Sequence, residues 1–248
     1  MQPGMRRRAV RGLVISLVGL ATLSSVALAQ PAMPEPPDIA AEVLADPLTA
    51  ETVFAAGACG GGKGSGRYAE EGFRLETTGT CGQEGAVVAV SVPGRGITIA
   101  DGDVSVAFKI TGTDGRRAAL HLTTRVSGPT WVGAFVQPSS GVADLYQVVD
   151  GVYTALMTHD DGQLPLAVDS DWNRMSLRVA GGDAWLLLND WPVLHASGVP
   201  EGAGGVGVRL VRVGARGNDE SAAVTLADLL VSPIAGGDPG RSPIYQQP

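Results

Sequence analysis

The second half of the chain is a succession of short segments rich in aliphatic and aromatic residues, separated by turn sequences about every ten residues. In residues 174–180, Met, Leu and Val alternate strictly with Arg and Ser, the pattern of a strand with one buried and one exposed face. Predicted strands cover 103–110, 118–126, 130–137, 144–149, 152–158, 174–180, 184–189, 191–196, 204–214 and 222–232. Strands that are short, numerous and joined by tight turns predict an all-β, antiparallel two-sheet β-sandwich or a barrel.

Several of these strands are joined by dipeptides that favour hairpins. Asp114-Gly115, Asp150-Gly151 and Asn189-Asp190 each stand between two predicted strands. Asp, Asn and Gly tolerate the positive φ angles that tight hairpin turns require. We therefore expect each of these dipeptides to form the turn between the two strands that flank it.

The first 29 residues have the features of a cleaved secretory signal peptide. A basic region with four arginines precedes the apolar run Leu13–Leu28, and Ala27–Ala29 forms an A-x-A cleavage site. The alternative, an uncleaved membrane anchor, is disfavoured because the apolar run is short for a span of about 20 residues. We expect a secreted or extracytoplasmic protein of the periplasm or cell surface, and the Arg7-Arg8 pair leaves both the Sec and the twin-arginine routes open.

The charge of the remaining chain argues against a nucleic-acid partner. Residues 1–29 hold four of the 18 basic side chains and none of the 25 acidic ones, so removing them leaves 14 basic side chains and a net charge of −11. A negative field of this size repels polyanions. No later apolar stretch is long enough to span a bilayer, so we expect no transmembrane helix after signal removal.

Cys59 and Cys81 are the only cysteines of the chain. Disulfides persist in exported proteins, so we predict that the two pair and close a loop worth about 3 kcal/mol on the chain-entropy account. Two free thiols are the alternative. A metal site built on the pair would need further ligands, and no histidine lies near either cysteine in the sequence.

Segments rich in proline or glycine flank the predicted sandwich. Residues 30–51 contain the proline-rich run 31–37, which predicts a stiff linker, and Asp38 can cap a short helix over 39–45. Residues 233–248 predict a disordered tail. The sandwich is therefore expected over residues 52–232, a length that is ample for one hydrophobic core.

The last third of that span has a recognisable order of motifs. Trp172-Asn173 opens an alternating strand, Asn189-Asp190 follows the next strand, Gly205–Gly207 reads G-V-G, and 227–229 reads A-D-L in the final strand. Together with "GVADLYQVVDGVYTAL" upstream, these motifs resemble concanavalin A-like (lectin, glucanase and laminin-G-like) domains of the exported bacterial type. The resemblance implies a jelly-roll sandwich. It implies function only broadly, because this fold hosts lectins, hydrolases and domains of unknown role.

The sequence lacks the motifs of enzymes expected on such a fold. Family-16 glycoside hydrolases on this fold carry E-x-D-x-x-E on one strand, and neither it nor G-x-S-x-G nor H-E-x-x-H occurs here. Glu70, Glu71 and Glu76 do not reproduce the spacing, and we interpret them as a solvated face with exposed ion pairs to Arg67 and Arg74. We therefore assign no catalytic residue, and an enzyme remains the alternative.

Two sets of residues are candidates for binding. Trp131, Tyr146, Tyr153 and Trp191 lie in strands and can offer flat aromatic faces to sugar rings. His121 alternates with Leu120 and Leu122, so we expect it to point away from the core. The second set suggests Ca²⁺, the one cofactor we consider, because oxygen ligands are close together in the sequence. Its members are Asp160, Asp161, Asp169, Asp171 and Asn173. The alternative for this set is two Asp-rich turns.

The stretch Gly57–Ser65, "GACGGGKGS", is similar to a nucleotide-binding P-loop. A P-loop needs Ser or Thr directly after the lysine and a helix after the loop. Here Gly64 follows the lysine and a strand-like segment comes next, so we expect no nucleotide partner.

Taken together, the sequence predicts an exported, non-catalytic domain that binds carbohydrate or another extracytoplasmic ligand, such as a cell-envelope component. A glycoside hydrolase and a structural envelope domain without a small ligand are the alternatives.

Overall fold

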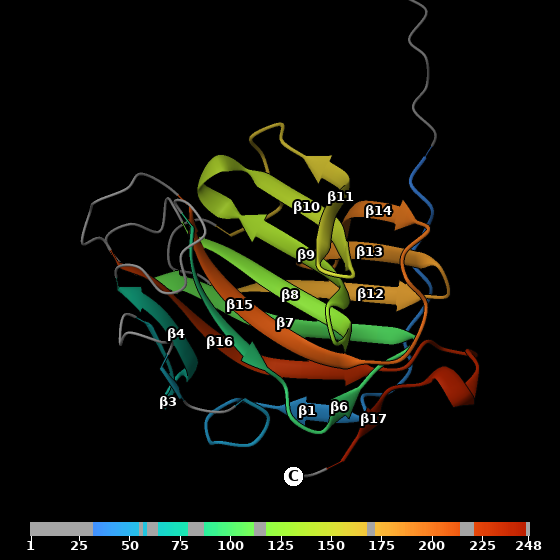
Figure 1. The fold of residues 1–248 in the computed structure, drawn as a ribbon, viewed down its shortest axis with the longest axis horizontal. Coiled ribbons are helices and arrows are strands. Elements are labelled where there is room, and N and C mark those ends of the chain that lie inside the picture. The colour runs from blue at the N-terminus through green and yellow to red at the C-terminus, as the bar shows by residue number, and fades with distance from the viewer. Residues whose placement is uncertain are drawn as a thin grey trace, which may run out of the picture. The chain divides into compact units, whose positions relative to one another are not determined.

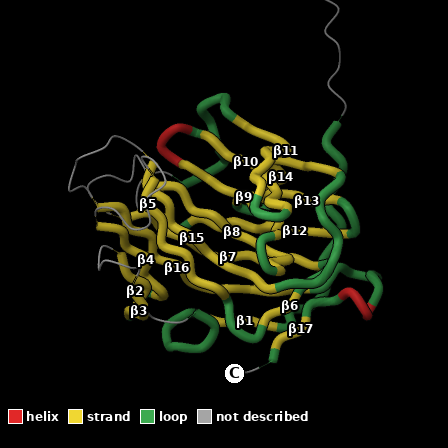
Figure 2. Tube along the Cα trace, viewed as in Figure 1, coloured by secondary structure: helices red, strands yellow, loops and turns green. Residues whose placement is uncertain are grey.

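Two antiparallel sheets pack face to face in the part of the chain that the computed structural model describes, which is residues 32–54, 57–58, 64–78, 87–111, 118–167, 172–213 and 221–246. Figure 1 shows β8, β9, β10 and β15 in one layer and β7, β12, β13 and β14 in the other. Figure 2 shows that almost every described element is a strand, with two short helical turns. The predicted antiparallel two-sheet sandwich is confirmed.

The larger sheet has nine strands in the described residues and the order β14-β13-β12-β7-β16-β4-β3-β2, with β1 paired to β16. Its strands are β1 (Leu44–Asp46), β2 (Gly57–Ala58), β3 (Gly64–Ala69), β4 (Gly72–Thr78), β7 (Gly102–Thr111), β12 (Asn173–Ala180), β13 (Asp183–Leu188), β14 (Trp191–Ser197) and β16 (Ser221–Ser232). The final strand β16 pairs with β7 and β4 and so lies in the middle of the sheet.

The second sheet has six strands in the described residues, in the order β11-β10-β9-β8-β15-β5. Its strands are β5 (Val87–Pro93), β8 (Ala118–Ser127), β9 (Thr130–Gln137), β10 (Val142–Val149), β11 (Val152–His159) and β15 (Gly205–Val213). A third, two-stranded sheet pairs β6 (Ile97–Thr98) with β17 (Ile244–Tyr245), and the short 3-10 helices are η2 (Pro138–Ser140) and η3 (Pro239–Arg241).

The core lies between the two large sheets and follows the alternation seen in the sequence. Leu120 and Leu122 of β8 and Leu210 of β15 face it from the six-stranded sheet, and Val106 and Phe108 of β7 face it from the other. Each large apolar side chain buried in this way stabilises the fold by roughly 1.5–3 kcal/mol. Because successive strand residues point to opposite faces, the residues between these core positions point outward.

Two of the three predicted hairpin dipeptides lie in described turns and have the expected conformation. Asp150 and Gly151, between β10 and β11, have φ angles of 52° and 81°. Asn189 and Asp190, between β13 and β14, have φ angles of 49° and 67°. The positive φ values match the twist of the flanking strands. Asp114-Gly115 lies outside the described residues, but the hairpin predicted there is wrong, because the strands before and after it, β7 and β8, belong to different sheets. The predicted signal peptide and both cysteines also lie outside the described residues.

The folded unit is longer at both ends than the sequence predicted, beginning at Met33. Residues 39–45, where Asp38 was expected to cap a short helix, instead form a β-bridge, two bends and the start of β1. Ile39 forms a bridge with Ile234, the Val43 amide donates to the Val231 carbonyl, and β1 pairs with β16. Pairing with an available strand satisfies the backbone groups of this segment, which decides against the weak local helix signal.

The C-terminal residues 233–246 are likewise part of the fold and not a disordered tail. Asp238 caps η3 by accepting from the Gly240 amide, and β17 pairs with β6. In Figure 1, β1, β6 and β17 lie at the lower edge of the sandwich. Among the described residues, no helix is long and apolar enough to cross a membrane.

Candidate functional site

The outward surface of the six-stranded sheet gathers aromatic and charged side chains from five strands. His121, Phe135, Asp144 and Arg209 each lie between two core-facing neighbours, so their side chains point away from the core. Tyr146 lies two residues after Asp144, and Trp131 and Tyr153 both pair in register with Val148, so these three side chains lie on the same side of the sheet. We call this surface the aromatic face. It comprises His121 of β8, Trp131 and Phe135 of β9, Asp144 and Tyr146 of β10, Tyr153 of β11 and Arg209 of β15.

Two tyrosines form the centre of the aromatic face. The rings of Tyr146 and Tyr153 are stacked, with centroids 5.0 Å apart. Tyr146 is buried, whereas Tyr153 is 53% exposed and presents its ring to solvent. Gly133 on the neighbouring strand leaves room for the Tyr146 ring, because a Cβ at this position would lie 2.6 Å from the tyrosine hydroxyl.

Trp131 extends this aromatic surface along the next strand. It pairs in register with Val148, and Val148 pairs with Tyr153 on its other side. The partly buried Trp131 and the exposed Tyr153 are thus held two strand steps apart, about 10 Å between backbones. Burial raises the pKa of Tyr146 well above its ordinary value, and the Arg209 charge and the Trp131 side chain partly oppose this shift.

His121 continues the face on the other side of Tyr146. Its Nδ1 lies 3.0 Å from the Tyr146 hydroxyl, and its ring stacks on Phe135 with centroids 5.2 Å apart. Burial, with the nearby Arg209 charge, lowers the pKa of His121 to about 3. The imidazole is therefore neutral at neutral pH and serves as a polar, uncharged part of the surface.

Asp144 is a buried carboxylate with spare hydrogen-bonding capacity. The Tyr153 hydroxyl donates to its Oδ2 at 3.5 Å, while Oδ1 is buried without a partner among the described residues. Burial and the Asp144 charge raise the pKa of Tyr153 to about 12, so the phenol stays protonated and can donate. A buried oxygen without a donor costs about 1–3 kcal/mol.

Arg209 lies in the same cross-strand row as Asp144. It pairs with His121, which pairs with Phe135, and Phe135 pairs with Asp144. The cation and the carboxylate therefore stand at opposite ends of the row, three strand steps or about 14 Å apart. The Arg209 Nε is buried and has no hydrogen-bond partner among the described residues.

Three of the four aromatic residues predicted from the sequence come together on this face. Trp191 does not, because it lies on β14 of the larger sheet, where it pairs with Leu188 and is 69% exposed. The outward orientation expected for His121 is confirmed by its contacts with Tyr146 and Phe135. Asp144 and Arg209 were missed, although each alternates with core residues and could have been found from that pattern.

The residues predicted to bind calcium are only partly described. Asp169 and Asp171 lie outside the described residues. The Asp161 carboxylate accepts from the Gln163 amide and contacts His159, and Asp160 is exposed. The Asn173 side-chain oxygen accepts from the Ala167 amide, as in a turn. Among described residues no cluster of three acidic, His or Cys side chains could hold a metal, and the calcium site stays a prediction.

The larger sheet has two shallow depressions, of about 270 Å³ and 360 Å³, on either side of Arg174 and Asp228. Arg174 donates from Nη1 to the Ser105 hydroxyl and the Asp228 carbonyl. The Asp46 carboxylate in the smaller depression accepts from Leu48 and Thr52. Arg174 and Asp46 in these depressions thus already form hydrogen bonds within the protein, whereas Asp144 and Arg209 on the aromatic face each have a buried polar atom without a described partner.

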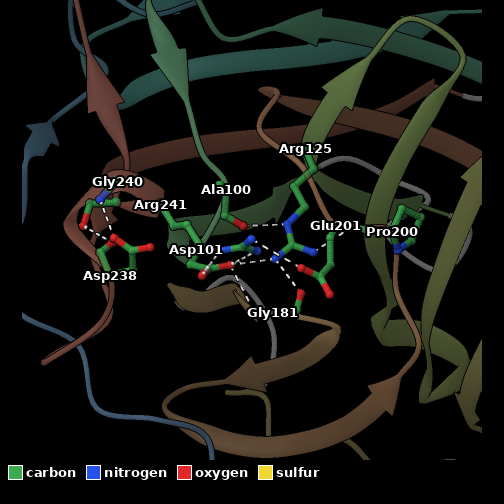
Figure 3. A network of polar contacts seen from close by, with 10 residues as sticks. Ala100, Asp101, Arg125, Gly181, Pro200, Glu201, Asp238, Gly240 and Arg241 are labelled. Carbon is green, nitrogen blue, oxygen red and sulfur yellow. Dashed lines mark hydrogen bonds and ion pairs between the residues drawn. The ribbon is translucent and has the colours of Figure 1, made fainter.

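A closed polar network joins the two sheets at another end of the sandwich (Figure 3). The buried Arg125 guanidinium donates to the carbonyls of Ala100, Gly181 and Pro200 and to the Asp101 carboxylate at 2.6–3.0 Å. Arg241 donates to Asp101 from the C-terminal segment. Burial would raise the pKa of Asp101, but hydrogen bonds from Arg241 and Gly181 and the two guanidinium charges hold it below its ordinary value. We interpret this network as a structural clamp.

The acidic residues near the N-terminal hairpin also have structural partners. Glu76 forms ion pairs with Arg67 and Arg74 at 3.4 and 3.5 Å, as the sequence predicted. Glu70 and Glu71 lie exposed in the turn between β3 and β4. Pairs exposed in this way contribute about 0–1 kcal/mol each.

Comparison with known proteins places the fold. No protein-family model matches the chain, and no curated protein matches it. Solved structures do. A carbohydrate-binding module, CBM66 from Bacillus subtilis, aligns with a TM-score of 0.52 and 15% identity over 68% of this chain and 91% of its own. A Bacillus licheniformis beta-glucanase aligns with a TM-score of 0.55 and 10% identity over 77% of this chain and 97% of its own.

A third similar structure is a protein of unknown function with a galectin-like fold from Bacillus subtilis, at a TM-score of 0.53 and 13% identity over 85% of this chain and 100% of its own. Structural similarity at identities this low establishes the fold alone, and the function has to be inferred from the residues of the site. With its two antiparallel sheets and this set of similar structures, the chain has the concanavalin A-like jelly-roll fold.

Proposed function

We propose that this protein is a non-catalytic carbohydrate-binding domain and that the aromatic face is its binding surface. The observation that carries the proposal is the exposed Tyr153 ring, stacked on Tyr146 and next to a buried Asp144 oxygen that has no partner among the described residues. Binding sites for small ligands typically combine aromatic surface with a few well-placed polar groups.

The chemistry of this surface suits a sugar. The apolar side of a pyranose ring can stack on Tyr153 or Trp131, which lie on β11 and β9, on either side of β10. A sugar hydroxyl can donate to Asp144 Oδ1, and the neutral His121 can exchange hydrogen bonds with another. The resemblance in fold to a carbohydrate-binding module supports the proposal without establishing it.

Hydrolysis is the second candidate, because a beta-glucanase is among the similar structures. Glycoside hydrolysis generally needs two carboxyl groups on either side of the scissile bond. The described strands of the six-stranded sheet contain a single carboxylate, Asp144. This favours binding over cleavage.

The predicted signal peptide over residues 1–29 suggests that the glycan is extracytoplasmic, in the periplasm or at the cell surface. The test is a glycan array with the full-length chain, in the presence of Ca²⁺ and of a chelator. We expect binding that Tyr153→Ala reduces at least about tenfold, since stacked aromatic contacts dominate such surfaces. Trp191→Ala is the matched control, because it removes an exposed aromatic ring on the other sheet.

The outcomes separate the candidates. Failure to bind any glycan in either condition would overturn the proposal and leave a structural role. Release of reducing ends from a bound glycan by the wild-type chain would favour hydrolysis. Loss of binding in Trp191→Ala but not in Tyr153→Ala would show that the binding site lies on the larger sheet and not on the aromatic face.

A further inference from the structure

The aromatic face has a charged group at each end, and the two ends differ in sign. Asp144 stands at one end of the cross-strand row and Arg209 at the other, with Phe135 and His121 between them. Neutral sugar hydroxyls can satisfy a carboxylate such as Asp144, since it only accepts hydrogen bonds. A guanidinium only donates, and its best partners are anionic oxygens that it can bind in a two-pronged manner.

Arg209 has the features of a ligand-binding cation more than of a structural one. The described arginines with structural roles are paired, such as Arg125 with Asp101 and Arg178 with Asp103. Arg209 forms no ion pair or hydrogen bond with a described residue, and its Nε is buried. A buried donor without a partner costs stability, so a structural arginine at this position would be expected to have an acceptor.

The neighbours of Arg209 reinforce this difference. His121, the residue directly paired with it in β8, has its Nδ1 directed at the Tyr146 hydroxyl and is neutral at neutral pH, so it offers no negative charge. The one carboxylate in the described strands of this sheet, Asp144, is three strand steps away, about 14 Å. Among the described strands of this sheet, no nearby carboxylate compensates the cation, although the full chain has a net charge of −7.

We propose that the aromatic face selects anionic saccharides, whose carboxylate or sulfate group binds Arg209 while neighbouring hydroxyls bind Asp144. This inference rests on the proposed function and specifies its ligand class. The spacing of the two charged groups fits a ligand longer than one sugar ring, with the anionic ring near β15 and a stacked ring near β10 and β11.

The test compares acidic polysaccharides with chemically matched neutral forms of themselves. Polygalacturonate, alginate and hyaluronan are titrated into the full-length chain alongside the same polymers after reduction of the carboxyl groups to hydroxymethyl groups. Sulfated polymers are compared with their desulfated forms, which distinguishes a carboxylate ligand from a sulfate ligand. We expect at least one acidic polymer to bind about tenfold or more tightly than its neutral form, with a preference that weakens as salt is added.

Arg209→Gln should abolish that preference by weakening binding of the acidic polymer to the level of the neutral form, while leaving the neutral form unaffected. Arg67→Gln on β3 is the matched control, because it removes an exposed arginine from the other sheet and should change neither affinity. Thermal unfolding of each variant shows whether it is folded.

The two proposals fail in different ways. Equal or tighter binding of the neutral forms, or an acid preference unchanged in folded Arg209→Gln, would overturn the charge selectivity and leave carbohydrate binding standing. Absence of binding to every polymer, acidic or neutral, together with a negative glycan array, would overturn both.

Discussion

At the scale of single residues, the aromatic face depends on two local properties. One is the space that a glycine leaves for a neighbouring ring, and the other is the neutral state of a buried histidine. Gly133 provides the space, because the Tyr146 ring occupies the volume where a side chain at position 133 would be. His121 is the neutral histidine, because burial and the Arg209 charge lower its pKa. Each makes a prediction that a single substitution can check.

Gly133→Ala should displace the Tyr146 ring and with it the stacked Tyr153. We expect the free energy of unfolding to fall by about 1–3 kcal/mol, the usual cost of overpacking, and ligand affinity to fall as well. Denaturant unfolding and glycan titration measure the two effects. Gly182→Ala is the control, since the nearest atom to its new Cβ would be 3.9 Å away. Equal effects in both variants would show that Gly133 is not special.

His121 should make the fold less stable in mild acid. Its pKa is lowered in the folded state, so between about pH 6.5 and 3 the unfolded chain takes up a proton that the folded chain does not. The His121 contribution is therefore fully present above pH 6.5 and is lost by about 1.4 kcal/mol per pH unit as the pH falls below it.

Denaturant unfolding of the wild type and of His121→Gln between pH 7 and pH 4.5 measures this effect. The variant should show a shallower decline, whatever its stability at neutral pH. Asp101, whose lowered pKa makes its own contribution disappear as the pH falls below about 4, lies outside this window. Parallel profiles for the two proteins would contradict the prediction.

At the scale of elements, the first and last described segments, residues 32–46 and 233–246, are parts of the sandwich and not linkers. The N-terminal segment lies against the larger sheet, where the Trp185 indole Nε1 donates to the Pro34 carbonyl at 3.1 Å. Arg178 of β12 donates to the Pro37 carbonyl. Proline has a carbonyl oxygen that accepts hydrogen bonds but no backbone N–H that needs an acceptor. A proline-rich segment can therefore cover a sheet without pairing with it as a strand.

Deleting residues 33–37 should therefore expose Trp185 and lower the free energy of unfolding by about 1–3 kcal/mol, through two lost hydrogen bonds and lost aromatic burial. Denaturant unfolding measures the loss, and quenching of tryptophan fluorescence reports the exposure. Combining the deletion with Trp185→Phe gives a double-mutant cycle. If the two changes add without coupling, the contact does not stabilise the fold.

At the scale of the whole molecule, Arg125 connects parts of the chain that no strand pairing joins. It belongs to β8, yet its side chain binds Gly181 of the turn between β12 and β13 and the loop residues Ala100 and Pro200. Its backbone has a φ of 54°, at a point where the pairing of β8 and β9 shifts register. This irregularity belongs to a polar cluster that also holds the C-terminal segment through Asp101 and Arg241.

Arg125→Met should lower the free energy of unfolding by about 3–5 kcal/mol, because it leaves the Asp101 carboxylate and three carbonyls without their buried donor. Arg95→Met is the control: Arg95 is exposed and paired with Glu51, so the expected change is within about 0.5 kcal/mol. Chemical denaturation measures both. A loss below 1 kcal/mol in Arg125→Met would show that the clamp is dispensable.

Much of the sandwich could be predicted from local pattern. The strand at residues 174–180 alternates because one face is buried. Short β-rich or apolar segments between turn signals identified β8, β9 and β13 within a few residues. The termini could not be predicted in this way. Residues 39–45 have a weak helical signal of their own, and only the available partner β16 makes the extended form more favourable.

The site shows the same division. Alternation alone places Tyr146 and His121 on an outward face, but it cannot say that β8, β9, β10, β11 and β15 are neighbours in one sheet. β15 and β8 are far apart in the sequence, and their pairing brings Arg209 into the cross-strand row that ends at Asp144. Trp191 lies on β14 of the larger sheet and so is not part of the aromatic face. The sequence by itself determined most strands between residues 103 and 232 and which way their side chains face, because that depends on neighbours along the chain. Tertiary structure alone decided which faces meet and which polar groups lack a partner, because those depend on residues far apart in the sequence.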